Sequence, residues 1–245
     1  GWDLSDDLTF KSITAYREGR TDTVIDFDTS PAPALDVPGR YRDHQTTQEF
    51  QLLFGYERLQ GVAGLYYLDA RAAGAFDTIV GALNLTIATS GSVETTSYAA
   101  YADVSYDFTD RLKASVGGRY TSDDRTGTVY RQNFAGLYSP LFGNDAAVPG
   151  LLRTDYTNDR TDDKFTPRVS VSFDLTDDVT TYVAYSEGFK AGGFDMRGDA
   201  VLTPSRVLPA DAAALSPCLD ASAGSSPVAD STVRLVMRPR FTPRR

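Results

Sequence analysis

Residues 180–194 read TTYVAYSEGFKAGGF, and the alternation in this stretch decides the fold. Successive residues of a β-strand point to opposite faces, so the first half of the stretch separates into two sets of side chains. One set is Thr181, Val183 and Tyr185, and the other is Thr180, Tyr182, Ala184 and Ser186. The second half places three glycines and two phenylalanines around one lysine, which is typical of a strand that bends near a membrane boundary. The stretch predicts a strand with one apolar face and one small, polar face.

A hexapeptide pattern recurs at three places along the chain. It reads DLSDDL at residues 3–8, DFTDRL at residues 107–112 and DLTDDV at residues 174–179. Aspartate, serine and threonine side chains bond their own backbone in tight turns, and the flanking apolar residues begin strands. The copies are unevenly spaced, so they indicate hairpin turns separated by variable loops rather than a regular solenoid repeat.

Seven segments alternate with a period of two residues and are predicted to be strands. They lie near residues 8–19, 47–56, 61–71, 94–108, 112–125, 161–175 and 179–190. Short turns are predicted near residues 3–8, 57–60, 109–111 and 176–178, and long loops at residues 20–46, 72–93 and 126–160. The first of these loops contains Pro31, Pro33 and Pro38, which a central strand would exclude. Long connections at one end and short ones at the other are the layout of an outer-membrane barrel.

The pair of strands around residues 94–125 fixes which face is apolar. When its apolar side chains face lipid, Asp103, Asp107, Lys113 and Arg119 all point into the lumen, where they can pair across strands or meet water. A slip of one residue would turn all four toward lipid, at about 2–4 kcal/mol for each basic residue near the midplane. We therefore expect a well-determined register.

Composition excludes several classes of protein. Among the 245 residues there is no run of about 18 apolar residues, so a helical membrane protein is excluded, whereas a β-barrel is not. The net charge of −9 and the pI of about 4.6 argue against nucleic acid as a partner. The single cysteine, Cys218, excludes an intrachain disulfide. The chain begins at Gly1 without a signal peptide, which suggests that the N-terminal part of an exported protein is missing.

Residues 182–194 resemble a strand motif of the TonB-dependent receptor family, Tyr-x-x-Tyr-Ser-x-Gly-Phe-Lys-x-Gly-Gly-Phe. The matching positions are Tyr182, Tyr185, Ser186, Gly188, Phe189, Lys190, Gly192, Gly193 and Phe194. The turn at residues 107–112 with VGGRYT at residues 116–121 is similar to another barrel segment of the family, as is QEFQL at residues 48–52 with VAGLYY at residues 62–67. The resemblance covers about residues 4–204.

This resemblance implies an all-β fold: a segment of an antiparallel transmembrane β-barrel with about seven meander strands. It implies a place in the Gram-negative outer membrane and uptake of scarce large solutes, such as ferric siderophores, powered by the inner-membrane TonB complex. Members of the family close about 22 strands around a plug. Seven strands make an incomplete barrel, so we expect a piece of a receptor that does not transport alone. Its partners would be outer-membrane lipid, the plug and missing strands, and the TonB complex reached through the plug.

Composition changes sharply after Pro204. Residues 205–245 contain Phe241 as their one aromatic residue and consist mainly of alanine, serine, proline and arginine. We therefore expect two regions, a partial receptor barrel at residues 1–204 and an irregular tail at residues 205–245. The tail is interpreted either as a disordered linker or as sequence read out of frame.

Side chains that could carry chemistry are few. His44 is the only histidine and lies in the predicted proline- and aspartate-rich loop, and Asp22, Asp26 and Asp28 lack the glycine and glutamate of a calcium loop. Asp123 and Asp124 are interpreted as a charged strand end. Tyr130 and Tyr138 are interpreted as ligand contacts or as members of an aromatic girdle. We expect no catalytic residue, cofactor or metal site.

Two alternatives to a receptor remain. A passive porin or an adhesin would also use a barrel of this kind, and a plug encoded just upstream would argue against it. A non-functional remnant of a broken gene would share the same sequence features, and an intact neighbouring reading frame would distinguish it. The transported ligand is not encoded in any pattern of the loops.

Overall fold

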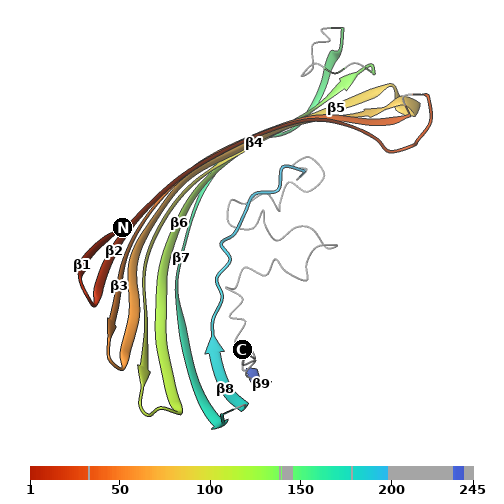
Figure 1. The fold of residues 1–245 in the computed structure, drawn as a ribbon. Helices are drawn as coiled ribbons and strands as arrows, with labels where there is room; N and C mark the ends of the chain where they lie inside the picture. Colours follow the sequence, from red (N-terminus) through yellow and green to blue (C-terminus); the bar gives the residue numbers. More distant parts are fainter. Residues whose placement is uncertain (33, 138, 140–145, 178, 198–233, 240–245) are drawn as a thin grey trace.

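The computed structural model describes residues 1–32, 34–137, 139, 146–177 and 179–197, and the backbone of residues 234–239. These residues form one antiparallel sheet in which nine strands follow one another in chain order. Figure 1 shows the sheet as an open, strongly curved wall with a concave and a convex face. The strands are β1 (Trp2–Ser5), β2 (Leu8–Asp26), β3 (Leu35–Tyr56), β4 (Leu59–Val80), β5 (Leu85–Asp107), β6 (Leu112–Ala135), β7 (Val148–Thr176), β8 (Val179–Ser186) and β9 (Arg234–Pro239).

The predicted meander of an incomplete barrel is confirmed, but most strands are longer than the alternation indicates. Each of β2 to β7 continues well into a region that was predicted to be loop. The connections opposite the short turns shrink to residues 27–34, residues 81–84 with the 3₁₀ turn Gly81–Leu83, and residues 136–147. The three predicted long loops are therefore mostly the upper parts of extended hairpins, which rise together at one end of the sheet (Figure 1).

Pro38 was wrongly placed in a loop, because it lies inside β3. It is paired with Val24 of β2. On the other side, the ladder between β3 and β4 passes from Asp36 directly to Gly39 and skips Pro38. Proline has no amide hydrogen to donate, so it fits where one ladder is interrupted.

The register of β5 and β6 is the one that the alternation predicts. Tyr101 lies opposite Arg119, and Asp107 lies opposite Lys113. A row of apolar side chains on the other face crosses four strands, with Val104 beside Val116, Val116 beside Val169, and Val169 beside Tyr185. We call the convex face with this row the outer face, and the concave face with the charged residues the lumenal face.

The height of the apolar part of the outer face matches a membrane. It runs from Tyr98 on β5 to Phe108, one residue past the end of β5, and both side chains are more than half exposed. At about 3.4 Å per residue this run is about 34 Å long, and a strand tilt of about 40° reduces its height to about 26 Å. Transmembrane barrels have an apolar band about 25 Å tall. Above Tyr98, the outer face of β5 continues with Thr96 and Glu94, so the extended hairpins project beyond this band.

All three copies of the hexapeptide lie at short turns, at the junctions β1–β2, β5–β6 and β7–β8. At the second copy, the Thr109 hydroxyl accepts the backbone N–H groups of Arg111 and Leu112, as the pattern predicts. The first aspartate of each copy has a further role, because it binds a side chain across the turn. Asp3 accepts from Thr9 at 2.8 Å, Asp174 accepts from Thr180 at 2.5 Å, and Asp107 pairs with Lys113 at 3.5 Å.

Strand β8 ends at Ser186, earlier than the predicted end near residue 190. The next residue, Glu187, still donates its backbone N–H to the carbonyl of Pro167 at 3.0 Å. Pro167 has no N–H with which to return that bond, so the ladder stops there. From Glu187 the chain leaves the sheet and crosses its concave side, drawn in light blue in Figure 1.

Strand β9 is antiparallel to β8, with Val179 opposite Pro239. Residues 198–233 and 240–245, which make up most of the predicted tail, lie outside the described residues, and so does Cys218. The boundary near residue 204 and the two interpretations of the tail stay predictions. Among the residues that the structure describes, no helix is long and apolar enough to cross a membrane.

Candidate functional site

The residues of the family motif divide between a strand and a segment on the lumenal face. Tyr182, Tyr185 and Ser186 belong to β8, as predicted. The remaining positions lie in residues 187–197, which form no regular secondary structure. We call residues 187–197 the lumenal strap. The motif positions within it are Gly188, Phe189, Lys190, Gly192, Gly193 and Phe194.

One arginine and one aspartate bind the backbone of the strap at Gly192, and a second arginine lies against it. Arg125 of β6 donates to the Gly192 carbonyl at 2.5 Å, and the Gly192 N–H donates to Asp162 of β7 at 3.1 Å. The guanidinium of Arg160 lies so close to Gly192 that a Cβ there would collide with it. Glycine at this point of the motif lets the strap pass directly over a charged side chain without displacing it.

The charges beneath Gly192 form a compact cluster of four. Arg125 lies opposite Arg160, and Asp123 lies opposite Asp162, on the facing strands β6 and β7. Like charges directly opposite each other destabilise a sheet, but each arginine is compensated by the aspartate two residues away on its own strand. Arg125 lies 3.3 Å from Asp123, and Arg160 lies 2.5 Å from Asp162. The cluster is neutral and largely covered, with the Asp123 side chain 12% exposed.

Beyond the cluster, two large side chains of the strap rest on glycines of the sheet. A Cβ at Gly127 of β6 would collide with the ring of Phe194. A Cβ at Gly91 of β5 would lie 3.3 Å from Met196, which also reaches Gly74 of β4. At the end of the strap, Arg131 donates to the carbonyl of Arg197 at 2.8 Å. The strap thus crosses β7 and β6, the Met196 side chain reaches over β5 to β4, and the last residue of the strap is bound to β6.

Burial under the strap changes the ionisation of its neighbours. Val129, between Gly127 and Arg131 on the lumenal face of β6, is 1% exposed. Desolvation raises the pKa of Tyr156, which lies opposite Val129, and the nearby carboxylate of Asp195 raises it further. Desolvation lowers the pKa of Arg131, and the charge of Arg153 acts in the same direction. Contact with water is therefore lost at Val129 and reduced around Tyr156 and Arg131.

Closer to the short turns, the lumenal face carries a second polar group of residues. Tyr101 donates to Glu49 at 2.5 Å, and the Arg119 guanidinium lies 5.2 Å from the ring centre of Tyr66 and 5.7 Å from that of Tyr101. Arg168 approaches Asp103 at 3.9 Å. Of the four lumenal charges, Asp103 and Asp107 therefore form ion pairs across strands, whereas Arg119 stacks on aromatic rings.

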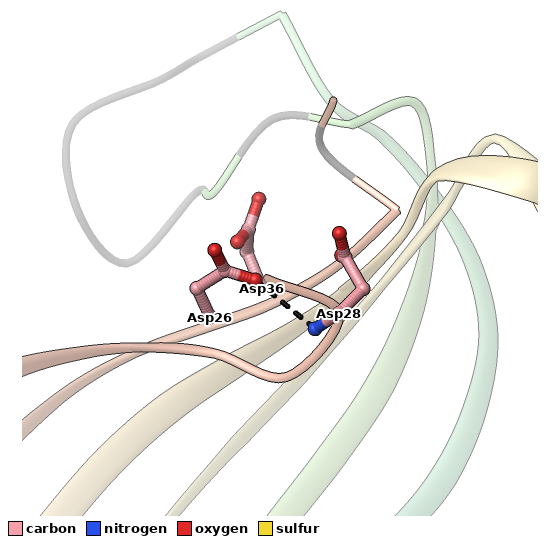
Figure 2. Close-up of side chains that lie close together, drawn as sticks. All are labelled: Asp26, Asp28 and Asp36. Carbon is pink, nitrogen blue, oxygen red and sulfur yellow. Dashed lines mark hydrogen bonds between the residues drawn. The ribbon is translucent and has the colours of Figure 1, made fainter. Parts of the chain in front are cut away.

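A third cluster lies at the tip of the β2–β3 hairpin, where Asp26, Asp28 and Asp36 place carboxylate oxygens within 4.8 Å of one another (Figure 2). The dashed line in Figure 2 joins the Asp28 N–H to Asp26 at 3.0 Å. Asp28 in turn accepts the N–H groups of Ser30 and Leu35. Hydrogen bonds from Ser30 and Leu35 lower the pKa of Asp28. These aspartates shape the turn, and Asp22 instead pairs with Arg40 at 2.7 Å.

The other candidates from the sequence lie apart from the strap. His44 is in β3, opposite Glu18 of β2 and Arg71 of β4, and not in a loop as predicted. Tyr130 is in β6 and not in a loop, where its hydroxyl donates to Gln132. Tyr138 lies outside the described residues. Alternation along β6 places Tyr130 on the same face as Tyr120, away from the strap.

Sequence reasoning found the residues of the strap but missed the charges that hold it. Asp123 and Asp124, beside Arg125, are predicted to be a charged strand end, which is wrong because they lie inside β6, and the prediction does not include Arg160 or Asp162. One signal was available, since the pattern Asp-x-Arg at residues 123–125 faces the pattern Arg-x-Asp at residues 160–162 once the two strands are aligned from their shared turn.

A curved meander with an apolar band outside and charges inside is the wall of a large transmembrane barrel. A sequence model described as the TonB-dependent receptor-like β-barrel matches residues 1–220. The chain therefore belongs to the TonB-dependent receptor β-barrel family.

Particular relatives are receptors of Yersinia. The chain is 25% identical to the pesticin receptor of Yersinia enterocolitica over 198 residues, which are 78% of this chain and 26% of that protein. It is 26% identical to the pesticin receptor of Yersinia pestis over the same shares. The crystal structure of the ferric yersiniabactin uptake receptor FyuA from Yersinia pestis has a TM-score of 0.62 at 21% identity, covering 80% of this chain and 28% of that one. The chain thus spans about a quarter of the length of the relatives it matches.

Proposed function

We propose that this chain is part of the barrel wall of an outer-membrane receptor that takes up siderophore-type or other large scarce solutes. The observation that carries the proposal is the contrast between its two faces, an apolar band of membrane height outside and paired charges inside. Membership of the receptor family supports it further. So do the names of the relatives, which are a pesticin receptor and a ferric yersiniabactin uptake receptor. These names describe receptors, which favours a binding and transport role over catalysis.

The extended hairpins would supply the first contact with the solute. Strands β2 to β7 continue beyond the apolar band, so their connecting ends stand clear of the membrane on one side. In the intact receptor, a solute such as a ferric siderophore would be captured there. Movement of a plug coupled to the inner-membrane TonB complex would then open a passage along the lumenal face. The net charge of −9 argues against nucleic acid as a partner.

The described sheet needs further strands before it can transport. Its two outermost strands, β1 and β9, each pair with one neighbour. A sheet edge within hydrocarbon leaves backbone groups unsatisfied, each at a cost of several kcal/mol, so a membrane barrel has to close. We infer that closure requires the remainder of a receptor, and that the described strands alone do not transport.

Uptake measurements test this function. The coding sequence would be extended on both sides, expressed in a Gram-negative host lacking its own siderophore receptors, and assayed with radiolabelled ferric siderophores. We expect uptake by the extended protein that is lost when the host lacks TonB, and no uptake by the 245-residue chain. Uptake that persists without TonB would favour a passive porin. A flanking sequence without a plug would also favour a porin, and an interrupted reading frame would favour a remnant.

Fractionation tests the membrane placement separately. We expect the chain to be recovered from outer-membrane vesicles only after extraction with detergent. Recovery in the soluble fraction as a folded monomer would contradict the placement, whatever the uptake assay shows.

A further inference from the structure

The lumenal face of β4 to β7 binds the lumenal strap, an irregular segment that forms no helix or strand. Its contacts are to backbone groups of the strap, through Arg125, Asp162 and Arg131. The side chains that fit into the sheet are the large apolar ones of Phe194 and Met196. They occupy places left open by glycines of β6, β5 and β4.

These contacts define a recognition pattern for a ligand. Charged groups that bind carbonyl and N–H groups accept most sequences, because every residue carries both. The glycines add selectivity, since they leave room for large apolar side chains that are two residues apart. A small residue two positions before the first of them is favoured, because a Cβ at Gly192 would displace the Arg160 guanidinium, whereas a Cβ at Gly193 would meet no atom within 4 Å. The pattern is met by an extended peptide of the form small-x-apolar-x-apolar.

The strap has a second possible position, along the edge of β7 next to β8. Strand β7 pairs with β6 over nearly its whole length, but its pairing with β8 covers only Arg168 to Thr176. Among the described strands, none lies on the β8 side of residues 155–166. If the β7–β8 register continued, Met196 would lie opposite Asn158. Gly188 gives the chain a point at which to turn, because glycine has the widest choice of backbone conformations.

We propose that the lumenal face of β4 to β7 is a peptide-binding groove and that the strap is its occupant within the same chain. When the strap leaves the groove and extends β8 along β7, the groove takes another extended peptide with the same pattern. This proposal depends on the fold and the contacts of the strap, and not on the proposed transport function.

Disulfide trapping tests the exchange in the full chain. With Cys218→Ser as background, the pair Gly127→Cys and Phe194→Cys reports the strap in the groove, because the Phe194 ring lies on Gly127. The pair Asn158→Cys and Met196→Cys reports the extended β8. Met196 lies on Gly91 of β5, two strands from Asn158 of β7 and hence about 9–10 Å away in the sheet. A disulfide needs Cα atoms within about 7 Å, so the second pair can close only after the strap has moved.

We expect both pairs to form disulfides under mild oxidation, and the single-cysteine variants to form no intrachain bond. If the second pair does not close while the first does, the strap does not exchange and the proposal is overturned. If the first pair does not close, the strap does not occupy the groove, which also overturns it.

Peptide binding tests the groove itself. A fluorescent peptide with the sequence EGFKAGGFDMR of residues 187–197 would be titrated into both locked variants and followed by anisotropy. We expect saturable binding to the variant locked at Asn158 and Met196, and binding at least about tenfold weaker to the variant locked at Gly127 and Phe194. A control peptide with alanine in place of the second phenylalanine and the methionine should lose most of the affinity. Equal binding to both variants, or no binding to either, would overturn the proposal.

Discussion

Replacing Val116 by arginine places a charge in the middle of the apolar band. Val116 lies on the outer face between Val104 and Val169, and its side chain is 59% exposed in the described sheet. At the surface of a water-soluble protein, a substitution at such an exposed position changes the free energy of unfolding by less than about 0.5 kcal/mol. Facing lipid near the midplane, the same arginine costs about 2–4 kcal/mol. The two environments therefore predict clearly different results.

The matched control is Ser105→Arg on the lumenal face at nearly the same depth. Ser105 lies opposite Ser115 and two residues from Asp103, so an arginine there meets the lumen and a carboxylate rather than lipid. We expect this variant to change the free energy of unfolding by less than about 1 kcal/mol. Both variants introduce arginine, so the difference between their free energies of unfolding reports which face of the sheet the arginine is on.

Urea unfolding in phospholipid vesicles measures both variants. The one tryptophan of the chain, Trp2, stacks on Phe10 with ring centres 5.7 Å apart and supplies the fluorescence signal. A cost of about 2–4 kcal/mol lowers the folding equilibrium constant by about 30-fold to about 700-fold, since each 1.4 kcal/mol is tenfold. If Val116→Arg is as stable as the parent chain, or if both variants lose the same amount, the outer face does not contact lipid.

Two further results are expected from positions outside this row. Gly64→Ala should destabilise the sheet by about 1–3 kcal/mol, because its Cβ would lie 2.8 Å from the Phe50 carbonyl and 2.5 Å from the Tyr101 ring. The control Gly55→Ala should be tolerated, because its Cβ would meet no atom within 4 Å. Urea titration measures the free energy of unfolding of both variants. Hydrogen bonds lower the pKa of Asp28, so its carboxylate stabilises the β2–β3 turn. This stabilisation should be complete above about pH 4 and lost as the pH falls through the lowered pKa. Hydrogen exchange at the Leu35 amide, which donates to Asp28 at 2.6 Å, measures this, and an equal pH response in Asp28→Asn would contradict it.

Within the apolar band, the sequence by itself determined the strands and their faces. Val104, Val116 and Val169 alternate with polar neighbours, as in the membrane barrels of this family, where lipid lies on one side of the sheet and a polar lumen on the other. Because of that contrast, apolar and polar residues alternate along each strand, and a slip of one residue would place every side chain on the wrong face. The three hexapeptides fixed the turns for a similar reason, since the geometry of a tight turn depends on residues that are adjacent in the chain.

Above the apolar band, only the tertiary structure decided where the strands end. Residues such as Arg20, Asp43 and Ala75 continue the ladders of β2, β3 and β4, but the contrast between an apolar and a polar face is lost there and the alternation disappears. The hydrogen bonds to neighbouring strands persist without it, because every residue except proline can form them. The path of the strap was equally hidden, because Arg125 and Asp162 meet Gly192 only after distant strands have been placed side by side.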